Sequence, residues 1–300
     1  MSSRLRSPLL RVLLSAVAVA ACDHERKDEL LLDIGVRENS VERLPDAHVP
    51  IPRGDLATIG EVGQWLFLAT RGLALAHAQV VERMGEVDRD LVLPLVDIDP
   101  AGTSGQVVFI RWPDARGRAV PPTLDEAQRW VLVSLAFGPD RVLDVELLEG
   151  GVLPGTVERR RVQAQLVAAK TLQERAGGAA FYTVDRFQTE PTGLKRKPQR
   201  LATVIHAIAQ GDQGPDFELA IDEPRKGKQR RDEPPLVVRE LAIHARGALA
   251  VDPVVTTLPD PHPITVMRAM QAARALHVRA ASGDYEIAAD GTVTRTGASP

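Results

Sequence analysis

The chain has 300 residues, of which 44% are hydrophobic and 26% are charged, and its formal net charge is −3. These values are ordinary for a globular protein with one large or two modest domains. The slight negative charge argues against general affinity for polyanions. Aromatic residues make up only 4% of the chain, which argues against the stacking platforms of proteins that bind single-stranded nucleic acids. We therefore expect no nucleic-acid partner.

Residues 1–21 have the pattern of an export signal peptide. Arg4, Arg6 and Arg11 precede an apolar run over 12–21 that ends in small residues. A helix that spans a bilayer needs about 20 apolar residues. The shorter run therefore predicts a signal peptide that is removed, not a retained transmembrane segment.

The end of this segment, Val19-Ala20-Ala21-Cys22, resembles the lipobox of bacterial lipoproteins. The resemblance implies cleavage before Cys22, a diacylglycerol on its sulfur and an acyl chain such as palmitate on its amine. It also implies a membrane lipoprotein that faces the periplasm or lies at the cell surface, and Asp23 favours the inner membrane. An ordinary signal peptide, or a cysteine packed in a core, is the alternative.

The resemblance extends over about the first two dozen residues, and no family is recognised for the rest of the chain. Cys22 is the only cysteine, so we expect no internal disulfide. The segment 22–56 is charged, contains prolines and has weak periodicity, which predicts a flexible tether.

The first predicted helix begins near Thr58, where Thr58 and Glu61 match a capping box. Its apolar residues recur at spacings of three and four, which predicts one buried stripe or the seam of a dimer. The residues of this stripe are Ile59, Val62, Leu66, Ala69, Leu73, Ala76 and Val80.

The rest of the first half, 57–153, mixes strand and helix patterns. Strands are predicted over 91–98, 106–112 and 141–149, because these runs are apolar and bounded by turn residues. A second capping box at Thr123 and Glu126 predicts a helix that runs through Leu135. The pair Gly150-Gly151 is a plausible boundary between the two halves.

The second half, 154–300, begins with a predicted helix over 157–176. Four predicted strands follow, over 181–187, 201–209, 217–221 and 236–245. A helix is then predicted over 264–278, and a hairpin turns at Asp290-Gly291. Successive strands without intervening helices favour an α+β fold with antiparallel sheets and helices packed on one face, in two similar-sized halves.

If the four strands form a meander, two basic connections emerge at one end of the sheet. The connection 210–216, at the opposite end, carries only acidic charge. The basic residues of the two connections, which are the candidate contacts to an anionic partner, are Lys195, Arg196, Lys197, Arg200, Arg225, Lys226, Lys228, Arg230 and Arg231. Such a rim suits an anionic lipid, an envelope polymer or an acidic protein surface. Two solvated hairpin loops are the alternative.

Histidines and aspartates offer weaker signals. The segments 44–48 and 258–262 share an Asp-x-His pattern, which we interpret as turn and cap residues. Asp97 and Asp99 likewise surround a turn. His77 and His277 fall in predicted helices and His206 and His244 in predicted strands, without the spacing of metal ligands. We predict no catalytic residue, metal ligand or cofactor.

The sequence thus predicts a lipid-anchored envelope protein that binds or scaffolds a partner and is not an enzyme. The alternative is a periplasmic hydrolase whose active site is assembled only in the fold. The partner, the pathway and the oligomeric state have no sequence signal.

Overall fold

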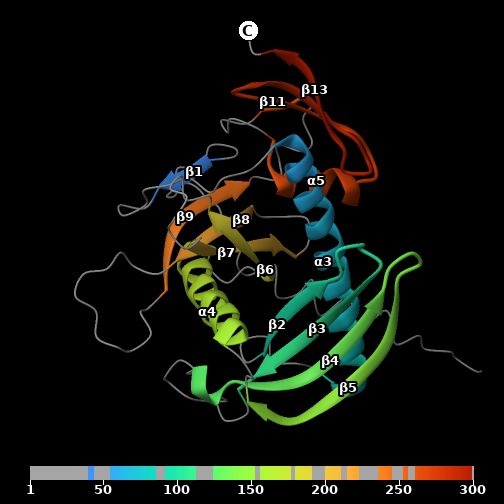
Figure 1. Cartoon of the computed structure of the whole chain (residues 1–300), viewed down its shortest axis with the longest axis vertical. Coiled ribbons are helices and arrows are strands. Elements are labelled where there is room, and N and C mark those ends of the chain that lie inside the picture. The colour runs from blue at the N-terminus through green and yellow to red at the C-terminus, as the bar shows by residue number, and fades with distance from the viewer. Residues whose placement is uncertain are drawn as a thin grey trace, which may run out of the picture.

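The structure is a computed structural model that describes residues 40–43, 55–85, 92–112, 124–152, 156–176, 180–190, 200–210, 215–222, 236–244, 253–255 and 261–298. Within these ranges the chain forms three α-helices and three β-sheets (Figure 1). This arrangement confirms the α+β prediction. Among the described helices, none is long and apolar enough to span a membrane. The predicted signal peptide, the lipobox and Cys22 lie outside the described residues.

Helix α3 (Leu56–Met84) packs against strands of all three sheets and runs along the molecule in Figure 1. All the residues of the predicted stripe are buried, so the helix is a core element of this chain. The predicted capping box is wrong. Asp55 is the N-cap, because its carboxylate accepts a hydrogen bond from the Thr58 amide at 2.9 Å.

The first half of the chain forms an antiparallel sheet in the order β2-β3-β4-β5. Its strands are β2 (Val92–Ile98), β3 (Ser104–Arg111), β4 (Gln128–Ala136) and β5 (Arg141–Val152). The helix predicted through Leu135 is wrong, since only the 3₁₀ turn η2 (Leu124–Glu126) precedes β4. Val131, Val133 and Leu135 are buried at every second position, and the four-residue spacing from Val131 to Leu135 fits a helix equally well. Gly150 and Gly151 lie within β5.

The second sheet contains the predicted meander, with the strand order β1-β9-β8-β7-β6. Its strands are β1 (Ser40–Arg43), β6 (Phe181–Glu190), β7 (Arg200–Ala209), β8 (Asp216–Asp222) and β9 (Val237–His244). β1 comes from the predicted tether and pairs antiparallel with β9, so this part of the segment is attached to the sheet.

Helices cover both faces of this second sheet. On one face, α4 (Thr156–Ala176) packs Ala164, Ala168 and Leu172 against apolar strand residues. On the other face, Ile208 of β7 packs with residues of α3 and α5 (Pro263–Gln271). The structure therefore adds a second helical layer to the one that the sequence predicts.

The C-terminal sheet has the order β10-β11-β12-β13. Its strands are β10 (Val254–Val255), β11 (Leu276–Ala280), β12 (Gly283–Ile287) and β13 (Val293–Ala298). The hairpin of β12 and β13 confirms the prediction at Asp290-Gly291. The helix predicted to reach 278 is too long, because Leu276, Val278 and Ala280 are buried with the two-residue period of a strand.

Candidate functional site

The meander brings the flanks of the two basic connections to the same end of the sheet. Glu190 lies opposite Arg200 in the β6–β7 register, and Asp222 lies opposite Val237 in the β8–β9 register. Arg200 is the first residue of β7. The other predicted contacts lie outside the described residues; they are Lys195, Arg196, Lys197, Arg225, Lys226, Lys228, Arg230 and Arg231.

The connection 210–216 at the opposite end of the sheet contains two aspartates, of which Asp212 lies outside the described residues and Asp216 is not a surface charge. Asp216, predicted in the acidic connection, is a buried residue of β8. Arg268 of α5 donates to both of its carboxylate oxygens, at 2.6 and 2.9 Å. Asp216 therefore ties α5 to the sheet. It does not contribute exposed negative charge to the end of the sheet that the sequence predicts to be acidic.

Asp99 is a turn former, as predicted. Its carboxylate accepts hydrogen bonds from the backbone amides and the hydroxyls of Thr103 and Ser104. These bonds, with the Ser104 hydroxyl as the largest contribution, lower the pKa of Asp99 to about 2. Asp99 is therefore ionised at neutral pH and holds the β2–β3 turn.

Asp97, two residues earlier, belongs to a polar latch formed by Arg161 and Gln165 of α4. Arg161 donates to Asp97 of β2 at 2.9 and 3.1 Å and to Asp185 of β6 at 2.5 Å. It also donates to the carbonyl of Val96 at 2.9 Å. One guanidinium thus joins the edge strand of the first sheet to the edge strand of the second.

Gln165, one helical turn later, makes the second contact of the latch. Its amide donates to the Pro94 carbonyl at 3.1 Å and to Asp185 at 2.8 Å, and it accepts from the Thr183 hydroxyl at 2.8 Å. Arg161 and Gln165 are four positions apart and therefore lie on one face of α4. Their side chains donate to the Val96 and Pro94 carbonyls of β2, on the side of this edge strand that has no neighbouring strand.

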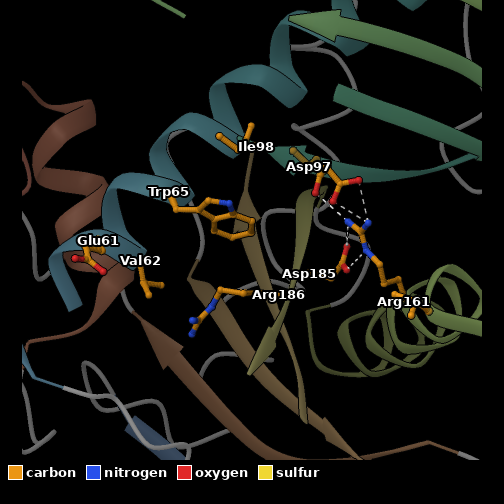
Figure 2. A pocket seen from close by; sticks show the side chains of 10 residues that line it. Glu61, Val62, Trp65, Asp97, Ile98, Arg161, Asp185 and Arg186 are labelled. Carbon is orange, nitrogen blue, oxygen red and sulfur yellow. Dashed lines mark hydrogen bonds and ion pairs between the residues drawn. The ribbon is translucent and has the colours of Figure 1, made fainter. Parts of the chain in front are cut away.

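A pocket of about 530 Å³ lies beside the latch, where α3, β2, α4 and β6 meet (Figure 2). We call it the junction pocket. Its apolar lining consists of Val62, Trp65, Val96, Ile98 and Val157. Its charged lining consists of Glu61, Asp97, Arg161, Asp185 and Arg186. The volume lies in the range of small-molecule pockets, although half of the lining residues are charged.

The charges of the pocket are arranged unevenly. Figure 2 shows the Asp97–Arg161–Asp185 network on one side and the Glu61–Val62 turn of α3 on the other, with Trp65 and Arg186 between them. The pKa of Arg161 is raised: burial acts to lower it, but the charges of Asp185 and Asp97 outweigh that effect. Arg161 is therefore a permanent cation within the latch.

A second polar cluster is buried between the meander and α5. It consists of His206 of β7, Glu218 of β8, His244 of β9 and His262, which precedes α5. His206 lies opposite Glu218 in the β7–β8 register, and Nδ1 of His206 is 3.4 Å from a Glu218 oxygen. The His244 and His262 rings lie against each other, with centroids 3.9 Å apart and planes tilted by 37°.

The hydrogen bond that His262 accepts fixes its tautomer. His262 is the N-cap of α5, and its Nδ1 accepts from the Ile264 amide at 3.1 Å. A neutral ring must then carry its proton on Nε2, which lies 3.0 Å from Glu218 Oε2. The cap of α5 is therefore His262 itself, whereas the turn and cap role interpreted for Pro259 and Asp260 lies outside the described residues.

His206 is held neutral by its surroundings. Burial lowers its pKa to about 3, and the Glu218 carboxylate opposes this effect only in part. Within the part of the chain that the structure describes, both ring nitrogens of His206 and one oxygen of Glu218 are buried without a hydrogen-bond partner. Among the described side chains, however, no three His, Cys, Asp or Glu residues are placed to hold a metal ion.

Sequence reasoning missed both groupings for the same reason. The residues of the junction pocket come from four elements, and those of the histidine cluster from three strands and a cap. The one available signal was that His206 and His244 each interrupt an apolar strand pattern. Buried histidines at such positions need polar neighbours, which the strand register then supplies.

No family model matches the chain, and comparison with curated proteins and with solved structures gives no match either.

Proposed function

We propose that the chain is a lipid-anchored protein of the bacterial cell envelope that binds an anionic partner and does not catalyse a reaction on it. The anchor is supported by the lipobox resemblance of Val19-Ala20-Ala21-Cys22. Each buried methylene of an acyl chain contributes about 0.8 kcal/mol, so two or three chains hold a protein firmly on a membrane. The folded body then faces the periplasm, or the outside of the cell.

The observation that carries the binding proposal is the register of the meander. It brings the strand ends that flank both basic connections to one end of the sheet. Each basic residue near an anionic surface contributes about 1 kcal/mol. In physiological salt this attraction falls off over about 10 Å from the surface. An anionic lipid headgroup, an acidic envelope polymer or an acidic protein surface would meet this rim.

The experiment is sedimentation of the protein with anionic vesicles. The test variant reverses Lys195, Arg196, Lys197, Arg230 and Arg231 to Glu. The control variant reverses three exposed basic residues elsewhere, Arg83, Arg141 and Lys170. We expect the test variant to lose binding and the control to retain most of it, and added salt to weaken the wild type. Equal sedimentation of both variants would remove the rim from the proposal.

The hydrolase alternative has less support from the site. The junction pocket has three carboxylates, and Arg161 forms ion pairs with two of them, Asp97 and Asp185. A carboxylate that is held in this way is suited to positioning an arginine more than to accepting a proton from a substrate.

A further inference from the structure

We propose that the contact between α5 and the meander is an acid-sensitive joint, in which a proton on His206 releases α5 from the sheet while α4 stays packed on the opposite face. The joint is formed by the buried cluster of His206, Glu218, His244 and His262. It is separate from the basic connections and from the lipid anchor.

The two faces of the meander differ in their chemistry, because each strand directs alternate side chains to opposite faces. At intervening positions of β7, β8 and β9, the α5 face carries the buried residues His206, Glu218 and His244. Among the buried residues compared here, those on the α5 face can gain a proton near neutral pH, and those under α4 cannot. The residues under α4 are Ile205, Ala207, Phe217, Leu219, Leu241 and Ile243.

One carboxylate oxygen couples His206 to His262. Oε2 of Glu218 lies 3.4 Å from Nδ1 of His206 and 3.0 Å from Nε2 of His262. The neutral His262 ring carries its proton on Nε2, so it presents a donor to this oxygen. A protonated His206 presents a second donor, and a positive charge, to the same oxygen. His206 then competes with His262 for Glu218.

The position of His262 determines how α5 begins. Nδ1 of His262 accepts a hydrogen bond from the Ile264 amide at 3.1 Å. The carbonyl of His262 accepts from the amides of Thr265 and Val266, at 2.9 and 3.2 Å. Loss of the contact to Glu218 therefore loosens the cap of the helix and its attachment to the sheet together.

The closed joint does not accommodate a charged His206. Its ring is fully buried, and neither nitrogen has a hydrogen-bond partner within the described residues. A protonated ring has two N–H donors, of which Glu218 can accept one. Burial is the main cause that lowers the pKa of His206 to about 3. The Glu218 carboxylate acts against this effect, and the charges of Arg186, His262 and His244 add to it.

Other contacts hold the joint closed while His206 is neutral. Arg268 of α5 donates to both oxygens of Asp216 in β8, and Val266 of α5 packs closely against Gly63 of α3. These contacts set the cost of release at neutral pH. Release admits water to the His206 ring and lets it take up a proton, so acid lowers this cost.

Hydrogen exchange measured by mass spectrometry tests the joint on the full chain carrying Cys22→Ser, which cannot be acylated at that sulfur. Peptides from α5 and α4 are compared at pH 7 and pH 5, after correction for the pH dependence of the intrinsic exchange rate. The range ends at pH 5 because model carboxyl groups take up protons mainly below it. We expect the His206 ring to raise the opening constant of α5 about 25-fold, since its pKa is about 3 when closed and 6.5 when exposed.

The same measurement on α4 is the internal control, because α4 packs on the apolar face of the same strands. Its opening constant should stay unchanged between the two pH values. Equal increases in α4 and α5 would mean that acid opens the whole fold, and a constant value in α5 would mean that the joint does not respond. Either result would overturn the proposal.

His206→Gln assigns the effect to this ring, because glutamine is polar but does not titrate. The opening of α5 should then lose about 25-fold of its pH dependence. His277→Gln, at an exposed position on β11, is the matched control and should keep the wild-type response. A response that is the same in both variants would contradict the assignment to His206.

The comparison of α4 with α5 in the parent chain needs no variant, so it tests the joint even if His206→Gln does not fold. The experiment contains no membrane and no anionic partner. Its result is therefore independent of the proposed function.

Discussion

Arg161 Nε of α4 and Asp185 Oδ2 of β6 lie 2.5 Å apart, and the same guanidinium donates to Asp97 and to the Val96 carbonyl of β2. Asp185 is almost fully buried, whereas 65% of the Asp97 side chain is exposed. The buried contact to Asp185 therefore attaches β6, the bond to the Val96 carbonyl attaches β2, and the contact to Asp97 closes the latch from the solvent side.

Replacement of Arg161 by Met should destabilise the protein strongly. The change leaves the buried Asp185 carboxylate without its cation, and removal of one partner of a buried pair costs about 3–5 kcal/mol. Replacement of Asp97 by Asn should cost under about 1 kcal/mol, because that partner is exposed. Urea unfolding of the two variants measures both effects, and losses of equal size would contradict this assignment.

The crossing of α3 and α5 depends on Gly63. A Cβ atom at this position would lie 2.4 Å from Val266 Cβ, so a larger residue forces the helices apart. Gly63→Ala gains about 1 kcal/mol of helix propensity, but overpacking typically costs about 1–3 kcal/mol. We expect a net loss of stability and a lower melting temperature. Glu82→Ala, exposed on the same helix, is the control that should change little, and a stabilised Gly63→Ala would refute the close crossing.

Acid should weaken the fold through His206. The pKa of its ring is about 3 in the folded chain, against the ordinary value of 6.5 for an exposed histidine, so between these values the unfolded chain binds a proton that the folded chain does not. The free energy of unfolding therefore falls as the pH drops from 6.5 toward 3, by up to about 1.4 kcal/mol per pH unit for this group.

Denaturant unfolding between about pH 7 and pH 4, a range that includes most of this interval, checks the expectation. His206→Gln removes the titrating ring, and its stability should depend less steeply on pH than that of the wild type. His277→Gln, at an exposed position on β11, should keep the wild-type slope. A slope that is the same in all three proteins would mean that the burial of His206 does not set the acid sensitivity.

The predictable parts of the fold are the segments in which the spacing of apolar residues fits only a helix or only a strand. The α3 stripe from Ile59 to Val80 recurs only at helical spacing, and the strands of the meander are separated by turn residues. The helix prediction for 124–135 was wrong because its two signals, the capping box and the four-residue spacing, also fit a strand that follows a turn. Packing of Val131 and Val133 against the core decides in favour of the strand.

The sites were harder to predict because they are made by register and by layer contact. His206 and Glu218 are 12 positions apart and meet only when β7 pairs with β8. Trp65 and Arg186 are separated by more than a hundred positions and share a pocket only because α3 crosses the β6 edge. No local sequence motif indicates that His206 lies beside Glu218, or that Trp65 and Arg186 line one pocket.

The central claim is the lipid anchor, since it determines where the folded body and the proposed basic rim would act. Mass spectrometry of the N-terminal peptide of the mature protein, purified from bacterial membranes, tests it most directly. We predict a peptide that begins at Cys22 and carries diacylglycerol on its sulfur. A bare Cys22 thiol, or a mature N-terminus at another residue, would contradict the claim.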